Sequence, residues 1–266
     1  MTSVQSIVRT VVPHPRLRWT LGLIGVLARK NFQTRFKRSY FGVALIALQP
    51  MVQALVYSIV FLKIFKVTRV EHYPLYILSG VMPWALITAG ILGATTSVVE
   101  NSSLVRKIDV PRMVFPLAAI GGACLAFVVP LAILLVAGGV TGTLGVNTLW
   151  VLLALPLQLV LIAAVGILAC GLHVAYRDVR YVLDAALLLL FYSVPVLYVM
   201  EIVPEGGRDL VRANPFTGVL SLWRAAILDR PLDGRAVTIS LVVAPLLLTL
   251  GAWSFQRRSR NFADLV

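Results

Sequence analysis

Residues 114–140 have the sequence VFPLAAIGGACLAFVVPLAILLVAGGV, a run without a single Asp, Glu, Lys, Arg or His. A helix needs about 20 apolar residues to cross a bilayer core of about 30 Å, so this run is long enough to span a membrane. A helix is the expected spanning element, because lipid offers no hydrogen-bond partner to exposed backbone groups. The run therefore predicts a membrane-embedded helix.

The rest of the chain repeats this pattern. The 266 residues are 59% hydrophobic and 13% charged, with a mean hydropathy of +0.90, whereas soluble domains are about 45–50% apolar. We therefore predict an all-α membrane protein with six transmembrane helices. The predicted spans are residues 41–65, 73–98, 114–140, 150–172, 182–200 and 236–255.

The basic residues predict the orientation of these spans. With six spans, 16 of the 24 Lys and Arg residues fall on the side that holds both termini. The positive-inside rule then places both termini in the cytoplasm, as expected for a multi-pass protein of the bacterial inner membrane. We attribute the net charge of +13 to basic residues facing anionic lipid headgroups, and not to nucleic-acid binding.

The first 40 residues differ in character from the rest. The segment 16–38 is basic and places Leu17, Leu21, Ile24 and Leu27 near helical spacing. This spacing favours an amphipathic interface helix along the cytoplasmic membrane surface over a disordered basic arm. We therefore divide the chain into a cytoplasmic tail with this helix, residues 1–40, and a six-span transmembrane domain, residues 41–266.

The predicted extracytoplasmic loop 201–235 contains a helix start. Asn214 suits the capping position and Pro215 the first helical position. Four apolar residues then share one helical face: Phe216, Leu220, Trp223 and Ile227. An apolar face in such a loop fits either a re-entrant helix that dips back into the membrane or a helix resting on the outer interface, and the pattern leaves both open.

The middles of the six runs contain no Asp, Glu, Lys, Arg or His. A carrier driven by an ion gradient normally keeps such a residue within the membrane. The chain also lacks the G-x-x-x-x-G-K-[ST] phosphate loop. We therefore expect a transport subunit that is not an enzyme, has no catalytic residue, metal or cofactor of its own, and takes its energy from a partner.

An intramembrane enzyme acting on an isoprenoid-linked sugar is the alternative from another class. It would need an essential carboxylate or histidine, so alanine variants of His72, His173, Asp229 and Asp233 that kept their function would exclude it.

Uncharged polar and aromatic residues gather on two of the predicted spans. Gln49, Gln53 and Tyr57 recur every four residues and so share a helical face. The fifth span carries four aromatic residues, Tyr181, Phe191, Tyr192 and Tyr198. Amides and aromatic rings suit the passage of a sugar chain. Ordinary helix packing and interfacial aromatic belts would explain the same residues.

Five short motifs lie in order along the chain. They are RFKRSYFG at 35–42 followed by Pro50, YPLYILSG at 73–80 followed by Pro83-Trp84, the segment 101–112 with Leu104 and Lys107 followed by Pro116, YRDVR at 176–180, and Asn214-Pro215. In order and spacing they resemble the motifs of permease subunits of type-2 ABC exporters, specifically the branch that exports O-antigen, teichoic acid, galactan and capsule polysaccharides.

The resemblance implies a homodimer carried on two copies of a separate ABC ATPase, which binds ATP and Mg. It implies a polyprenyl-linked polysaccharide as substrate, with a drug, antibiotic or lipid as the alternative cargo. It also implies three sets of site residues. The ATPase-coupling set is Glu100, Asn101, Leu104, Arg106, Lys107, Arg112, Tyr176, Arg177 and Asp178. The substrate-channel set is Gln49, Gln53, Tyr57, Tyr181, Phe191, Tyr192 and Tyr198. The exit-gate set is Asn214, Pro215, Phe216, Leu220 and Trp223.

Overall fold

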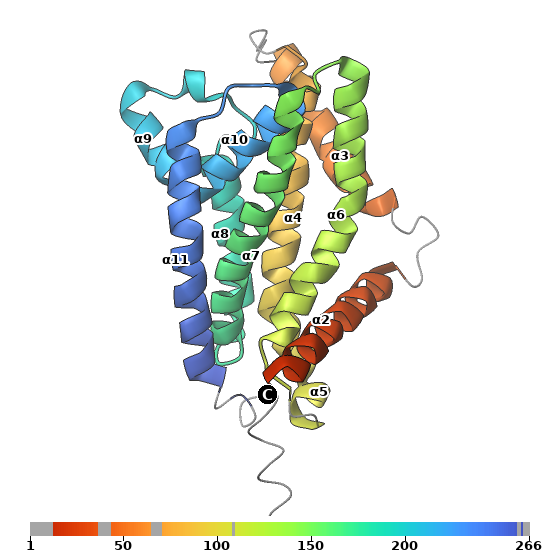
Figure 1. The fold of residues 1–266 in the computed structure, drawn as a ribbon. Helices are drawn as coiled ribbons and strands as arrows, with labels where there is room; N and C mark the ends of the chain where they lie inside the picture. Colours follow the sequence, from red (N-terminus) through yellow and green to blue (C-terminus); the bar gives the residue numbers. More distant parts are fainter. Residues whose placement is uncertain (1–12, 37–43, 65–70, 108–109, 260–261, 263–266) are drawn as a thin grey trace, which may run out of the picture.

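The computed structural model describes residues 13–36, 44–64, 71–107, 110–259 and 262, and the regular elements in these residues are helices (Figure 1). Within the described residues, four helical segments are long and apolar enough to cross a membrane. They are α4 (Tyr73–Glu100), α6 (Val114–Thr141), η2 with α7 (Val146–Trp150 and Val151–His173) and α11 (Gly234–Ser259). These segments confirm the helices predicted over 73–98, 114–140, 150–172 and 236–255.

The first predicted run forms a shorter helix. Helix α3 (Ala44–Ile59) continues into a π-helical turn, η1 (Val60–Ile64). The ends of the predicted span at 41–43 and 65 lie outside the described residues.

The fifth predicted helix, 182–200, is wrong at its C-terminal end. Helix α8 (Val179–Ser193) stops at Ser193, and the chain is irregular from Val194 to Val199. Val194 has φ −95° and ψ 144°, an extended conformation. The next residue is Pro195, and a proline both disfavours the α region for the residue before it and lacks the N–H that a helix requires.

The long helices form one bundle. Helix α7 packs between α11 and α4, and α6 packs on α4 (Figure 1). Helices α3 and α8 also pack on α4. We call the end with α5 (Ser102–Lys107) and the turn at 174–178 the inner end. The opposite, outer end holds η2, η3 (Met200–Ile202) and α9 (Glu205–Ala213) (Figure 1).

Small residues set the distances between these helices. A Cβ atom on Gly251 of α11 would lie 2.6 Å from the carbonyl oxygen of Ala164 on α7. One on Gly166 of α7 would lie 2.8 Å from the Cβ of Ala94 on α4. Close packing of backbones through small residues is typical of membrane helices, where no hydrophobic effect drives the helices together.

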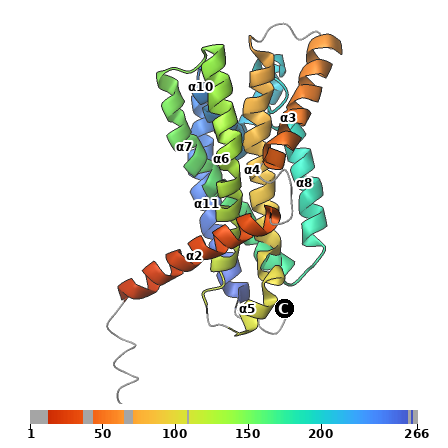
Figure 2. The same ribbon diagram turned by 90° about the vertical axis from the view of Figure 1, so that its right-hand side faces the viewer.

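Helix α2 (Pro13–Phe36) lies obliquely across the part of α6 nearest the inner end (Figure 2). Ala28 is buried opposite Gly121 and Gly122 of α6, where a Cβ on Gly121 would lie 3.1 Å from the Ala28 Cβ. The helix favoured for the N-terminal segment is thus confirmed over the disordered arm. Leu21, from the predicted apolar stripe, is exposed and does not take part in this contact.

Candidate functional site

Four of the seven predicted channel residues line one groove. Gln49, Gln53 and Tyr57 of α3 face Phe191 of α8 across a cavity of about 570 Å³, which we call the α3–α8 groove. Gln53 Nε2 donates a 3.2 Å hydrogen bond to the Tyr57 hydroxyl, which holds these two polar groups together. The remaining lining comes from α3, α4 and α8: Pro50, Val81, Trp84, Ala85, Thr88, Ala89, Asp184, Leu187 and Leu188.

Aromatic rings connect this groove to helix α10 (Pro215–Leu228). The Phe191 ring lies 6.1 Å from Tyr57 and 5.8 Å from Trp84, centroid to centroid. Trp84 in turn packs edge-on against Phe216 of α10 at 5.8 Å. Sequence reasoning did not assign Trp84 to the channel, although its place in the Pro83-Trp84 motif within a predicted span was a usable signal.

The other three predicted channel residues do not line the groove, although Tyr192 lies beside it. The Tyr192 ring packs edge-on against Phe191 at 5.1 Å, next to the groove. Tyr181 is exposed near the start of α8. The Tyr198 hydroxyl donates to the Ser193 carbonyl oxygen at 2.9 Å, after the helix has ended. The prediction that Tyr198 lies on the same spanning helix as Phe191 is therefore wrong, because the helix ends at Ser193, before Pro195.

The predicted gate residues belong to α10. The Asn214 side-chain oxygen accepts from the Phe216 backbone N–H at 3.1 Å, and Pro215 occupies the first turn, so the predicted helix start is confirmed. The helix packs among α4, α7 and α11. Phe216, Leu220 and Trp223 are buried, but so are most other residues of α10. The prediction of one apolar face is thus too narrow, because the neighbouring helices enclose this helix on several sides.

Side chains donate hydrogen bonds to four carbonyl groups of the irregular segment after α8. An Arg224 Nη2 group donates to the carbonyl oxygens of Pro195 and Val196. The Tyr73 hydroxyl donates to the Leu197 carbonyl at 2.9 Å, and the Tyr76 hydroxyl to the Tyr198 carbonyl at 2.7 Å. Irregular backbone inside a membrane protein is tolerated where protein groups satisfy it. Sequence reasoning counted Arg224 only as a loop charge and missed this role.

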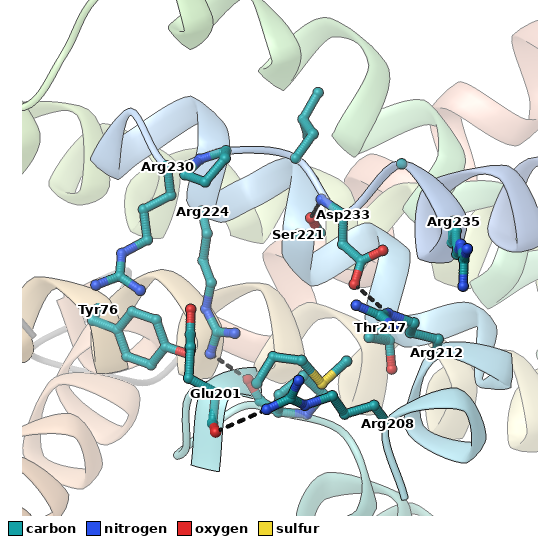
Figure 3. Close-up of a pocket in the computed structure, with 15 residues that line it drawn as sticks. Tyr76, Glu201, Arg208, Arg212, Thr217, Ser221, Arg224, Arg230, Asp233 and Arg235 are labelled. Atoms are coloured by element: carbon teal, nitrogen blue, oxygen red, sulfur yellow. Dashed lines mark hydrogen bonds and ion pairs between the residues drawn. The ribbon is translucent and has the colours of Figure 1, made fainter. Parts of the chain in front are cut away.

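A second and larger cavity, of about 970 Å³, opens at the outer end (Figure 3). We call it the outer cavity. Its polar lining consists of Tyr76, Glu201, Arg208, Arg212, Thr217, Ser221, Arg224, Arg230, Asp233 and Arg235. Arg212 Nε donates to the Asp233 carboxylate at 2.7 Å, and this hydrogen bond raises the pKa of Arg212 above its ordinary value. Asp233 also accepts from the backbone N–H of Ala236 at 3.2 Å.

The predicted coupling residues lie at the inner end. Asn101 ends α4, and its side chain donates to the Ser97 carbonyl at 2.8 Å. Its own carbonyl accepts from the N–H groups of Leu104 and Val105. This turn separates α5 from α4 and leaves Glu100 and Arg106 exposed.

The turn between α7 and α8 lies at the same end. Tyr176, Arg177 and Asp178 are all exposed there. The Arg112 guanidinium lies 5.9 Å from the centroid of the Phe262 ring, which ties the start of α6 to the C-terminal region. The side chain of Lys107 lies outside the part of the chain that the structure describes.

Comparison with known proteins gives a consistent family. The family model described as ABC-2 type transporter matches residues 22–228. The chain is 23% identical over 257 residues to an O-antigen export system permease protein RfbA of Klebsiella pneumoniae, covering 94% of this chain and 99% of that protein. It is 24% identical over 252 residues to the protein of the same name from Myxococcus xanthus, covering 92% and 95%.

Proposed function

The chain belongs to the ABC-2 type transporter family, and we propose that two copies of it form the membrane channel of an ATP-driven exporter of a lipid-linked cell-surface polysaccharide. It is a multi-pass protein of the bacterial cytoplasmic membrane. The relatives support the proposed cargo, because proteins named O-antigen export permeases align with this chain over almost its whole length.

The α3–α8 groove is the observation that supports a sugar cargo most directly. It combines two amides and a phenol, from Gln49, Gln53 and Tyr57, with the rings of Trp84 and Phe191. Aromatic faces stack on the apolar faces of sugars, and amides and hydroxyls exchange hydrogen bonds with sugar hydroxyls. In this proposal the groove forms part of the wall of the channel, and α10 gates its outer end through the contact between Trp84 and Phe216.

The proposed topology has six crossings with both termini in the cytoplasm. The α3–η1 segment spans 44–64, about 30 Å of helix at about 1.5 Å per residue, which supports a crossing there. Helix α8 with the irregular segment after it would supply the fifth crossing. Helix α10 would be a re-entrant helix, since it is buried among α4, α7 and α11. Residues 1–40 would form the cytoplasmic tail and interface helix, and 41–266 the transmembrane domain with the gate loop 201–235.

The proposed energy source is a pair of separate ABC ATPase subunits, which bind ATP and Mg. In this proposal they dock on the inner end, against α5 and the exposed turn at Tyr176–Asp178. The nine coupling residues named above form the proposed contact, and the second copy of the chain completes the channel.

Export from reconstituted vesicles tests this proposal. The chain would be purified alone and after co-expression with the ABC ATPase encoded beside it, and both ATP hydrolysis and polysaccharide transfer would be measured. We expect no hydrolysis by the chain alone, and a stable complex of two plus two subunits that moves polysaccharide only with ATP. Transfer of a drug but not of polysaccharide would overturn the cargo, and transfer by the chain alone driven by an ion gradient would overturn the mechanism.

A further inference from the structure

The outer cavity holds more positive charge than its own carboxylates neutralise. Five arginines line it, at 208, 212, 224, 230 and 235, against the carboxylates of Glu201 and Asp233. Asp233 is already engaged by Arg212 and by the first turn of α11. Arg208 lies 4.0 Å from the Glu205 carboxylate, and Arg212 pairs with both Asp233 and Asp209. Arg224, Arg230 and Arg235 then share the cavity with the single carboxylate of Glu201, so positive charge remains in excess there.

Two of these arginines face the same aromatic ring. The guanidinium carbon of Arg224 lies 3.9 Å from the centroid of Tyr76, and that of Arg230 lies 5.1 Å from it (Figure 3). Two cations near one ring repel each other, and the repulsion grows where water is partly excluded. An anion seated between the two guanidinium groups would remove that repulsion.

Arg224 also has an unused hydrogen-bond donor. Its side chain is only 8% exposed, and its Nη2 group serves the Pro195 and Val196 carbonyls. Its Nε, which is buried, has no hydrogen-bond partner among the described residues. A buried donor without an acceptor destabilises the fold, and does so more strongly when the group is charged. Arg224 therefore lines the cavity while one of its buried, charged donors lacks an acceptor among the described residues.

We propose that the outer cavity binds the phosphate group of a lipid. Guanidinium groups bind phosphate oxygens through paired hydrogen bonds, and three arginines against the one carboxylate of Glu201 suit a negatively charged group. The volume of about 970 Å³ exceeds the need of an inorganic ion, and Met200, Pro231 and Leu232 add apolar surface. Tyr76 lies within the first turn of α4, at the outer end of the bundle. The site is therefore near the surface of the membrane on that side, where lipid headgroups are found.

Two lipids present this chemistry, namely the polyprenyl phosphate end of the proposed cargo and an anionic phospholipid. Native mass spectrometry of the full chain with its ATPase partner would measure the binding of added undecaprenyl phosphate and of phosphatidylglycerol. Phosphatidylcholine, which has a phosphate but no net charge, serves as the reference lipid. Only the measurement with undecaprenyl phosphate rests on the proposed function.

The variants Arg230→Gln and Arg235→Gln test the site. The control is Arg257→Gln, because Arg257 also stacks over a ring, that of Trp253 at 3.8 Å, but near the end of α11 that faces the inner end. We expect Arg230→Gln to weaken binding of the preferred anionic lipid about tenfold, which corresponds to loss of one charged hydrogen bond. We expect Arg257→Gln to leave that binding unchanged.

The lipid that shows this loss identifies the source of the phosphate group. The proposal fails if neither anionic lipid binds better than phosphatidylcholine, or if Arg230→Gln and Arg257→Gln behave alike. A complex that exports polysaccharide without binding either anionic lipid would refute the phosphate site alone. A complex that binds phosphatidylglycerol through Arg230 without exporting polysaccharide would refute the proposed function and leave the site intact.

Discussion

Trp223 and Gln158 are joined across the bundle by a 2.6 Å hydrogen bond, in which the indole Nε1 donates to the Gln158 side-chain oxygen. The Gln158 amide nitrogen donates in turn to the Pro83 carbonyl at 2.9 Å. Both side chains are fully buried. One amide therefore ties α10 to α7 and α4, and holds the proposed gate helix against two of the three helices on which it packs.

Replacing Gln158→Leu should destabilise the protein by about 1–2 kcal/mol, the range for hydrogen bonds between membrane helices. The change leaves the buried Trp223 N–H without an acceptor. Thermal unfolding of the detergent-purified protein would measure the loss. Gln256→Leu, at an exposed position on α11, is the control and should have little effect. Trp223→Phe should lower the melting temperature less in the Gln158→Leu background than in the wild type. If the two substitutions had additive effects, the hydrogen bond between Trp223 and Gln158 would not couple the two side chains.

Removing the Tyr57 side chain should slow polysaccharide export about two- to tenfold, the factor that corresponds to one aromatic contact. Tyr57 lines the α3–α8 groove, whereas Tyr181 is exposed outside it. Export from inverted membrane vesicles would be compared for Tyr57→Ala, Tyr57→Phe and Tyr181→Ala. We expect Tyr181→Ala to stay near the wild-type rate. Tyr57→Phe should lie between the wild type and Tyr57→Ala, because it keeps the ring and loses the hydroxyl that Gln53 binds. An equal loss in both alanine variants would argue against a path along this groove.

Gly218→Ala should destabilise the contact between α10 and α11 by about 1–3 kcal/mol, the usual cost of overpacking. An added Cβ would collide with the Ser240 hydroxyl and the Ala236 carbonyl. Gly206→Ala in α9 is the matched control, since a Cβ there meets nothing within 4 Å. It should leave the melting temperature unchanged or raise it, because alanine is the better helix former. Similar melting temperatures for the two variants would show that the helices can move apart at no cost.

Glu100→Arg should separate ATP hydrolysis from export while membrane insertion stays normal. Glu100 is exposed at the end of α4, directly before the turn into α5, where we place the ATPase contact. The readouts are ATPase activity and polysaccharide transfer of the reconstituted complex. Glu71→Arg reverses an equally exposed charge at the outer end and should leave the two activities coupled. Normal export by Glu100→Arg would place the coupling contact elsewhere.

The sequence alone predicted most of the helices, because a membrane helix depends on length and polarity within one segment. Each of the runs at 73–98, 114–140, 150–172 and 236–255 is long and apolar enough to span the membrane without help from another segment. The predicted boundaries differ from those in the structure by four residues at most. The same reasoning failed at 194–200. There Pro195 interrupts the helix. The segment after the break is buried and therefore as apolar as a spanning helix, so its composition did not reveal the break.

The order of the motifs along the chain also sufficed to indicate the family. The α3–α8 groove and the outer cavity, in contrast, depend on the tertiary structure. Trp84, Gln158 and Arg224 lie far apart in the sequence, and none of them was assigned to a site from its own helix. Only the packing of α4, α7, α8 and α10 brings Trp84 against Phe191 and aims Arg224 at the Pro195 and Val196 carbonyls. Periodicity determines which residues share a helix face, whereas the crossing of the helices decides which faces meet.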